Sequence, residues 1–272
     1  MTFGEILAHT TGTTPERLAY GEDHLQFGHL YLPEGAGPHP VAIVIHGGCW
    51  LAEYDLGHIS HLAAALAGAG VAAWSLEYRR VGDPGGGWPG TFEDVARGAD
   101  HLRELADTHP LDPDRVVAIG HSAGGHLALW LGSRAYGASE GSRRSGNPIR
   151  LRGVVSLAGI TDLGRAVSEE VCGDAAGQLL GGAPARVPER YRRSSPLDLL
   201  PLGLPQRLIH GARDEIVPLA MVEDYRAAAT RAGDDVRLVV AADAAHFELI
   251  APWSEVWPDV REAVMELLGE EP

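Results

Sequence analysis

Ser122 stands in the pentapeptide GHSAG, residues 120–124, between an apolar run and a helical pattern. A serine in a sharp strand-to-helix turn is typical of a nucleophile elbow, whose strained backbone exposes the hydroxyl at the end of a sheet. Gly120 and Gly124 would let the strand and the helix approach without a clash. The N-terminus of the following helix offers N–H groups and a positive dipole to a developing oxyanion. The alternative interpretation is a glycine-rich turn in which serine only caps the helix.

A carboxylate and a histidine follow Ser122 in the chain order that a catalytic triad on such a sheet requires. Asp214 lies in HGARDEIVP after the apolar run 206–211, and His246 lies in DAAHFEL after the run 236–241. Asp214 would orient His246, which would take the proton of Ser122 and return it to the leaving group. The spacing therefore predicts nucleophilic catalysis by a Ser–Asp–His triad.

Each member of this triad has a competing interpretation. Glu215 and Asp243 are carboxylates close to the expected positions, and the chain contains 13 histidines. Asp214 could instead cap a turn, and His246 could be a histidine of a surface loop. The prediction depends on finding all three residue types in the right order after the right strands.

The stretch HGGCW, residues 46–50, follows an apolar strand and predicts an oxyanion hole. Gly47 and Gly48 allow the backbone to turn there. The N–H groups of Gly48 and Cys49 would then join that of Ala123 around the reaction centre of Ser122. Each such donor typically contributes about 3 kcal/mol to transition-state stabilisation.

Other polar and aromatic residues near these motifs have weaker claims to a role. We expect Trp50 and His121 to contact substrate, with core packing as the equal alternative for Trp50. No base follows Cys49 in a matching pattern, so we treat it as a small side chain whose backbone matters. The stretch YDLGHISH, residues 54–61, lacks a full set of metal ligands, so we expect no metal. The glycines of GAGVAA, residues 68–73, precede a strand, which favours a helix C-cap over a dinucleotide site.

Apolar or alternating runs take turns with helical patterns along the chain, which predicts an α/β fold with a mainly parallel sheet covered by helices on both faces. The expected strands are Leu25–Leu32, Val41–His46, Val71–Tyr78, Arg115–Gly120, Arg152–Gly159, Gln206–Gly211 and Val236–Ala241. The expected helices are Ile59–Ala67, Phe92–Ala106, Ala123–Arg134, Leu219–Ala232 and Glu255–Leu268. We expect one domain over 1–272, with one or two short helices in 160–205 as a small cap. The stretch Ser133–Pro148 reads as a surface connection.

Composition excludes several classes of binding partner and of catalytic chemistry. The net charge of −15 opposes binding to nucleic acid or to a membrane surface. The chain contains no lysine, which excludes Schiff-base, pyridoxal-phosphate and Walker A chemistry, and we expect no cofactor. Two cysteines give no disulfide framework, which favours a reducing compartment. Neither a signal peptide nor a bilayer-spanning run is evident, so we expect a cytoplasmic location. As partners we expect a small ester or amide substrate, and we allow for a homodimer.

Taken together, these motifs make the chain resemble the α/β-hydrolases, and among them the esterases and kynurenine formamidases (arylformamidases). The resemblance runs from about Leu25 onward through HGGCW, LEYRRVGDPGGGWPGTFEDV, GHSAGGHLAL, LAGITDL, SSPLDLLP and HGARDEIVP. It implies the triad Ser122, Asp214 and His246 and an oxyanion stretch at residues 47–50. Formamidases often have an aromatic residue where this chain has Cys49.

The sequence thus predicts a metal-independent serine hydrolase that cleaves a small carboxylic ester or an aryl formamide through an acyl-enzyme on Ser122. Two alternatives stay open. One is an acyltransferase or a small-peptide hydrolase with the same triad, and the other is a non-catalytic receptor for a small molecule on this fold.

Overall fold

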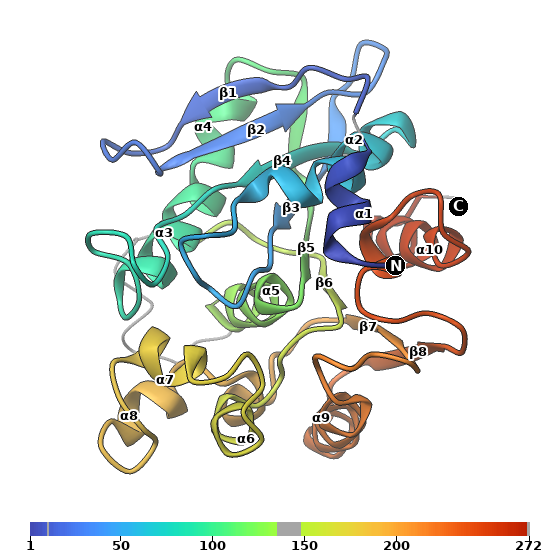
Figure 1. Cartoon of the computed structure of the whole chain (residues 1–272). Coiled ribbons are helices and arrows are strands. Elements are labelled where there is room, and N and C mark those ends of the chain that lie inside the picture. The colour runs from blue at the N-terminus through green and yellow to red at the C-terminus, as the bar shows by residue number, and fades with distance from the viewer. Residues whose placement is uncertain (10, 135–147, 271–272) are drawn as a thin grey trace.

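Eight strands form one sheet in the order β1-β2-β4-β3-β5-β6-β7-β8 (Figure 1). The computed structural model describes residues 1–9, 11–134 and 148–270. From β3 to β8 every neighbouring pair is parallel, whereas β1, β2 and β4 pair antiparallel. The strands are β1 Glu16–Ala19, β2 Phe27–Tyr31, β3 His39–Ile45, β4 Ala72–Leu76, β5 Leu111–His121, β6 Gly153–Leu157, β7 Gln206–Gly211 and β8 Val236–Ala241.

The sheet separates two apolar cores. Alternate side chains of a strand point to opposite faces, so Val41 and Ile43 of β3 join one core while Ala42 and Val44 join the other. All seven residues of β3 are buried, which explains why its residues 41–45 are continuously apolar instead of alternating.

Helices cover both faces of the sheet (Figure 1). Residues of α1, α2 and α10 fill the core on one face, and residues of α3, α4, α5, α6, α7 and α9 fill the core on the other. The helices are α1 Phe3–Ala8, α2 Ser60–Gly68, α3 Gly90–Asp100, α4 Leu102–Ala106, α5 Ala123–Ser133, α6 Leu163–Ser168, α7 Ala175–Leu180, α8 Pro188–Arg192, α9 Leu219–Ala232 and α10 Trp257–Leu268. Short 3₁₀ helices occur at η1 Leu56–Ile59, η3 Pro196–Leu199 and η4 Glu248–Ile250.

These elements confirm the predicted α/β-hydrolase fold. Each expected strand is present with small differences at its ends, and β7, β8 and α9 have the expected bounds. The pattern over 92–106 forms two helices, α3 and α4, which meet at His101. Sequence analysis missed α1 and β1, which lie in the first two dozen residues. The expected connection Ser133–Pro148 lies mostly outside the described residues.

The 160–205 segment contains three short helices, α6, α7 and α8, and the turn η3, where one or two helices were expected. Its apolar side chains are buried in the same core as α5, including Leu163 and Leu179. It also contacts the glycine-rich loop before α3, because the Trp88 N–H donates to the carbonyl of Leu179 at 2.7 Å. The segment is therefore packed onto the body of the molecule.

Cys49 and Cys172 form a disulfide bond, with Cα atoms 5.8 Å apart and a sequence separation of 123. Two cysteines were expected to give no disulfide framework and to fit a reducing compartment, and this bond contradicts that expectation. Sequence reasoning treated a pair of cysteines as too few for a framework, but folding brings the loop after β3 next to the turn between α6 and α7. The expected cytoplasmic location loses the support of reduced cysteines, because disulfides persist mainly in oxidising compartments. Within the described ranges, no helix is long and apolar enough to cross a membrane.

Candidate active site

Ser122 occupies the turn between β5 and α5 with φ 56° and ψ −119°, a conformation that non-glycine residues rarely adopt. Close packing around it requires glycine on both sides. A Cβ on Gly120 would lie 2.1 Å from the carbonyl oxygen of Gly124, and a Cβ on Gly124 would lie 2.1 Å from that of Ile45. The predicted strained elbow at Ser122 is confirmed in its backbone geometry.

Asp214 and His246 are hydrogen-bonded to each other, with His246 Nδ1 2.7 Å from Asp214 Oδ2. Asp214 follows β7 and His246 follows β8, so neighbouring parallel strands deliver both loops to the same edge of the sheet. Gly211 allows the two loops to approach, because a Cβ there would lie 2.3 Å from the carbonyl oxygen of Ala245. Since Nδ1 is bonded to the carboxylate, Nε2 is the ring nitrogen of His246 that can act as a base.

The Asp214 carboxylate is fully buried. Burial alone would raise the pKa of Asp214. The hydrogen bond from His246 and the N–H groups of Val217 and Ile216 outweigh burial and hold that pKa below its ordinary value. The competing acids are placed differently, since Asp243 pairs with Arg213 at the surface and Glu215 is exposed.

His121 contacts the loop that contains His246 instead of lining an open surface. Its ring is 1% exposed, and its Nε2–H donates to the carbonyl oxygen of His246 at 3.0 Å. The two rings pack with centroids 4.5 Å apart. Burial, together with the nearby His246, lowers the pKa of His121 well below its ordinary value, so its ring is neutral. We expected His121 to contact substrate, but its ring is buried, so a substrate could touch it only if the ring became exposed.

The loop after β3 has an unusual backbone. Gly48, Cys49 and Trp50 have φ values of 94°, 52° and 58°, so three consecutive residues are left-handed. Gly47 packs directly on the turn at Ser122, because a Cβ on Gly47 would lie 2.7 Å from the carbonyl oxygen of His121 and 3.1 Å from Ser122 Cβ. This close approach explains why the sequence needs glycine at the first position of the turn.

The N–H groups of Gly48, Cys49 and Ala123 donate to no acceptor within the described part of the chain. Buried N–H groups without a partner are rare in folded proteins. Ala123 is fully buried at the first position of α5, where helical N–H groups have no acceptor of their own. Gly48 and Cys49 are half-buried, and all three residues remain candidates for the oxyanion hole that the sequence predicts.

His46 holds the Gly47–Gly48 peptide from behind. Its Nδ1 lies 2.8 Å from the carbonyl oxygen of Gly47, and its Nε2 lies 3.0 Å from Glu77 Oε1. The His46 ring therefore contacts both the loop after β3 and the buried Glu77. In a trans peptide the carbonyl and the N–H point in opposite directions, so the Gly48 N–H points away from His46.

Glu77 is the buried partner of this arrangement. Burial alone would raise the pKa of Glu77, but His46 and Arg80 lower it below its ordinary value. Glu77 also accepts the N–H groups of Leu56 and Tyr78. The Tyr78 ring stacks on His46 at 4.3 Å. A charged network at the end of β4 thus supports the loop after β3.

Trp50 packs in the core, which was the alternative interpretation for it. It is completely buried, and its indole N–H donates to His126 Nδ1 at 3.2 Å. His126 Nε2–H donates to the carbonyl oxygen of Ser194 at 2.9 Å, which connects the loop after β3 to the segment following α8. Burial lowers the pKa of His126 to about 4, so this link uses a neutral ring.

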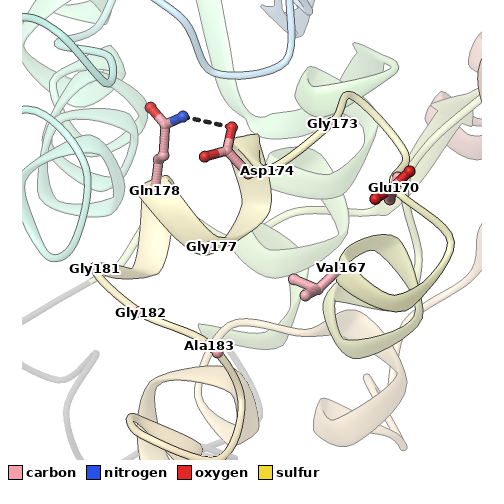
Figure 2. A pocket seen from close by; sticks show the side chains of 9 residues that line it. All are labelled: Val167, Glu170, Gly173, Asp174, Gly177, Gln178, Gly181, Gly182 and Ala183. Atoms are coloured by element: carbon pink, nitrogen blue, oxygen red, sulfur yellow. Dashed lines mark hydrogen bonds between the residues drawn. The ribbon is translucent and has the colours of Figure 1, made fainter.

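A groove of about 670 Å³ lies between the end of α6 and α7 (Figure 2). Its lining includes Glu170, Gly173 and Asp174 beside the disulfide, and Gln178 donates to Asp174 at 2.6 Å. None of the three triad candidates lines it.

The remaining motifs have structural roles. Asp55 caps η1 through the Gly57 N–H, and His61 bonds to the carbonyl oxygen of Ile6. No group of three metal-ligating side chains occurs within residues 1–9, 11–134 and 148–270. Gly70, with φ 91°, follows the end of α2 and supports the predicted C-cap. Sequence analysis missed His46 and Cys172. The signal for Cys172 was only that it is the second of two cysteines.

Comparison with known proteins agrees with this geometry. A model of the BD-FAE family matches residues 29–228, more than half of the chain. The esterase LipC of Mycobacterium tuberculosis is 26% identical over 226 residues, which are 80% of this chain and 56% of that protein. A probable isoprenylcysteine alpha-carbonyl methylesterase, ICMEL1 of Arabidopsis thaliana, is 30% identical over 112 residues, 41% of this chain and 23% of that protein. The chain thus spans between about a quarter and just over half of the length of these curated relatives.

Among solved structures, a truncated carbohydrate esterase from gut microbiota superposes with a TM-score of 0.81 at 20% identity. The match covers 95% of this chain and 97% of that one. At this identity the likeness establishes the α/β-hydrolase fold.

Proposed function

We propose that this chain, which belongs to the BD-FAE family, is a serine esterase that cleaves small carboxylic esters through an acyl-enzyme on Ser122. The observation that carries the proposal is the buried Asp214–His246 pair at the sheet edge where Ser122 stands in a left-handed turn. The names of the curated relatives, which are esterases, support the same reaction class.

In the first step, His246 Nε2 takes the proton of Ser122 Oγ as the oxygen attacks the ester carbonyl carbon. The carbonyl oxygen becomes an oxyanion, which the N–H groups of Gly48, Cys49 and Ala123 stabilise. His246 then gives the proton to the leaving alcohol as the carbon–oxygen bond breaks. Water repeats the sequence on the acyl-enzyme and releases the acid. Asp214 keeps Nδ1 protonated and stabilises the imidazolium throughout.

The direct test compares wild type with Ser122→Ala on a short aryl acetate. We expect kcat/KM to fall by about 10⁴-fold or more. Equal turnover by both proteins would refute the role of Ser122.

The acyl group and the leaving group need a second comparison. The resemblance to arylformamidases makes N-formylkynurenine the informative alternative substrate. A preference of more than tenfold in kcat/KM for formylkynurenine over the aryl acetate would assign formamide hydrolysis, and the reverse preference would assign ester hydrolysis.

The two remaining alternatives give different signals. An acyltransferase would show faster release of the leaving group when an acceptor alcohol or amine is added. A non-catalytic receptor would bind the ester without turnover, and a fluorophosphonate would leave Ser122 unmodified.

A further inference from the structure

Cys49 differs from its neighbours in how its backbone is held. Gly48 accepts the N–H of Leu51 at 2.9 Å, and Trp50 accepts the N–H of Val81 at 2.8 Å. The peptide N–H and carbonyl of Cys49 bond to no other group within the described ranges. With φ 52° its backbone is in the left-handed region, which residues other than glycine rarely occupy unless their surroundings impose it. The Cys49 side chain packs against the core, and its bond to Cys172 is the covalent link from this residue to another part of the fold.

Cys172 lies on a well-anchored turn between α6 and α7. The N–H of Val171 donates to Ala166 at 2.9 Å, that of Gly173 to Glu170 at 2.8 Å, and that of Ala175 to Cys172 at 3.3 Å. The side chains of Val171 and Ala175 are buried in the core that also contains Trp50. A disulfide to this turn therefore ties the loop after β3 to a fixed part of the molecule.

We propose that Cys172 is a positioning residue for the oxyanion hole, which acts through its bond to Cys49 and makes the activity depend on the redox state of that bond. The inference rests on the proposed function, because it concerns the N–H of Cys49 as an oxyanion donor. Breaking the bond leaves the catalytic pair of Asp214 and His246 intact, and it frees the Cys49 peptide to leave the left-handed conformation. The transition state then loses a donor, whereas binding of the uncharged substrate changes little.

The reaction that breaks the bond is thiol–disulfide exchange with a dithiol. A dithiol thiolate attacks Cys49 Sγ or Cys172 Sγ and forms a mixed disulfide, releasing the other sulfur as a thiol. The second dithiol sulfur displaces the remaining cysteine. Two electrons and two protons pass to the protein, which gains two thiols, and the dithiol becomes a cyclic disulfide. Both cysteines are partly exposed, so a small dithiol can reach them.

The test measures the kinetics of the full chain before and after treatment with dithiothreitol. We expect reduction to lower kcat for an aryl acetate by about tenfold or more while KM changes less than twofold, because the lost interaction acts in the transition state. Reoxidation should restore kcat. Cys172→Ser should have the low kcat without treatment, and it should not respond to dithiothreitol.

Amide hydrogen exchange gives a readout that does not depend on catalysis. We expect faster exchange in the peptide 46–52 after reduction, with no change in β7 (206–211). If wild type hydrolyses no ester, the proposed function fails, and the exchange result still decides whether the bond holds the loop.

Three results would overturn the inference. The first is a kcat within twofold of wild type after reduction, with unchanged exchange in 46–52. The second is faster amide exchange over the whole chain after reduction, which would mean that the bond stabilises the entire fold and does not specifically position the loop after β3. The third is alkylation of both cysteines in protein that has not been treated with a reductant, which would mean that the disulfide is not formed.

Discussion

At the scale of single residues, the account depends on which carboxylate serves His246. Asp214 follows β7 and Asp243 follows β8, each after a short turn, so the two carboxylates look equivalent in the sequence. Of these two carboxylates, Asp214 bonds to the His246 ring in the structure, whereas Asp243 pairs with Arg213 at the surface. Asp243 therefore serves as an internal control for the proposed role of Asp214.

Asp214→Asn should lower kcat by about 10⁴-fold, because the amide cannot stabilise the imidazolium and favours the wrong tautomer of His246. Asp243→Asn should leave kcat within about twofold of wild type. Steady-state kinetics on an aryl acetate check both. A larger loss in Asp243→Asn than in Asp214→Asn would reverse the assignment.

Glu77 supplies a second test at this scale. Glu77→Gln removes the buried charge that faces His46 and Arg80, and breaking a buried pair typically costs about 3 kcal/mol of unfolding free energy. Because His46 holds the Gly47 carbonyl, we also expect kcat to fall by about tenfold. Urea unfolding and kinetics measure the two effects.

Glu104→Gln is the matched control, since Glu104 also contacts a histidine, His101, but its side chain is 77% exposed. The control should change the unfolding free energy by well under about 1 kcal/mol. Similar losses in the two variants would mean that the buried network contributes nothing special.

At the scale of elements, glycines decide how closely α5 can approach the sheet. Gly124 is the example, because a Cβ there would meet the carbonyl oxygens of Ile45 and His46 at 2.1 and 2.4 Å, and backbone atoms cannot rotate away. Gly124→Ala should therefore cost about 3 kcal/mol of stability or prevent folding.

Gly177→Ala gives the opposite expectation within α7. Among the described residues, no heavy atom outside the backbone of α7 and the two chain neighbours lies within 4 Å of a Cβ added at Gly177. Alanine also has the higher helix propensity, so we expect a gain of about 0.5 to 1 kcal/mol. Thermal and urea unfolding of both variants check the pair. Equal effects of the two substitutions would show that the approach of α5 to β3 is not tight.

The parts of the fold that could be predicted are those with a strong local signal. Continuous apolar runs predicted β3 and β5. The glycines around Ser122 predicted the sharp turn at the end of β5. β1 was missed because its burial pattern is mostly exposed, so Glu16–Ala19 carries little apolar periodicity. The bond of Cys49 to Cys172 was missed because nothing local in the sequence records which distant loops meet.

At the scale of the whole molecule, buried histidines make stability depend on pH. Burial lowers the pKa of His126 to about 4 and that of His58 to about 3, whereas in the unfolded chain a histidine takes up its proton near 6.5. The unfolded state therefore binds more protons between those values. Stability is fully present above about pH 6.5 and is lost as the pH falls toward 4.

For His126 alone the loss between pH 7 and pH 5 is on the order of 2 kcal/mol. Urea unfolding at a series of pH values should show this slope, and His126→Gln should make it shallower. His24→Gln is the control, because the His24 side chain is 81% exposed and should leave the slope unchanged. A pH-independent unfolding free energy from 7 to 5 would contradict the neutral, buried state of these rings.

Ser122 is proposed as the nucleophile of a triad whose members follow three neighbouring strands. The most direct measurement is peptide mapping by mass spectrometry after treatment with a fluorophosphonate. The account predicts one phosphonyl group on Ser122 in wild type, much slower labelling in Asp214→Asn and none in Ser122→Ala. Labelling at another serine, or no labelling of the folded wild type, would contradict it.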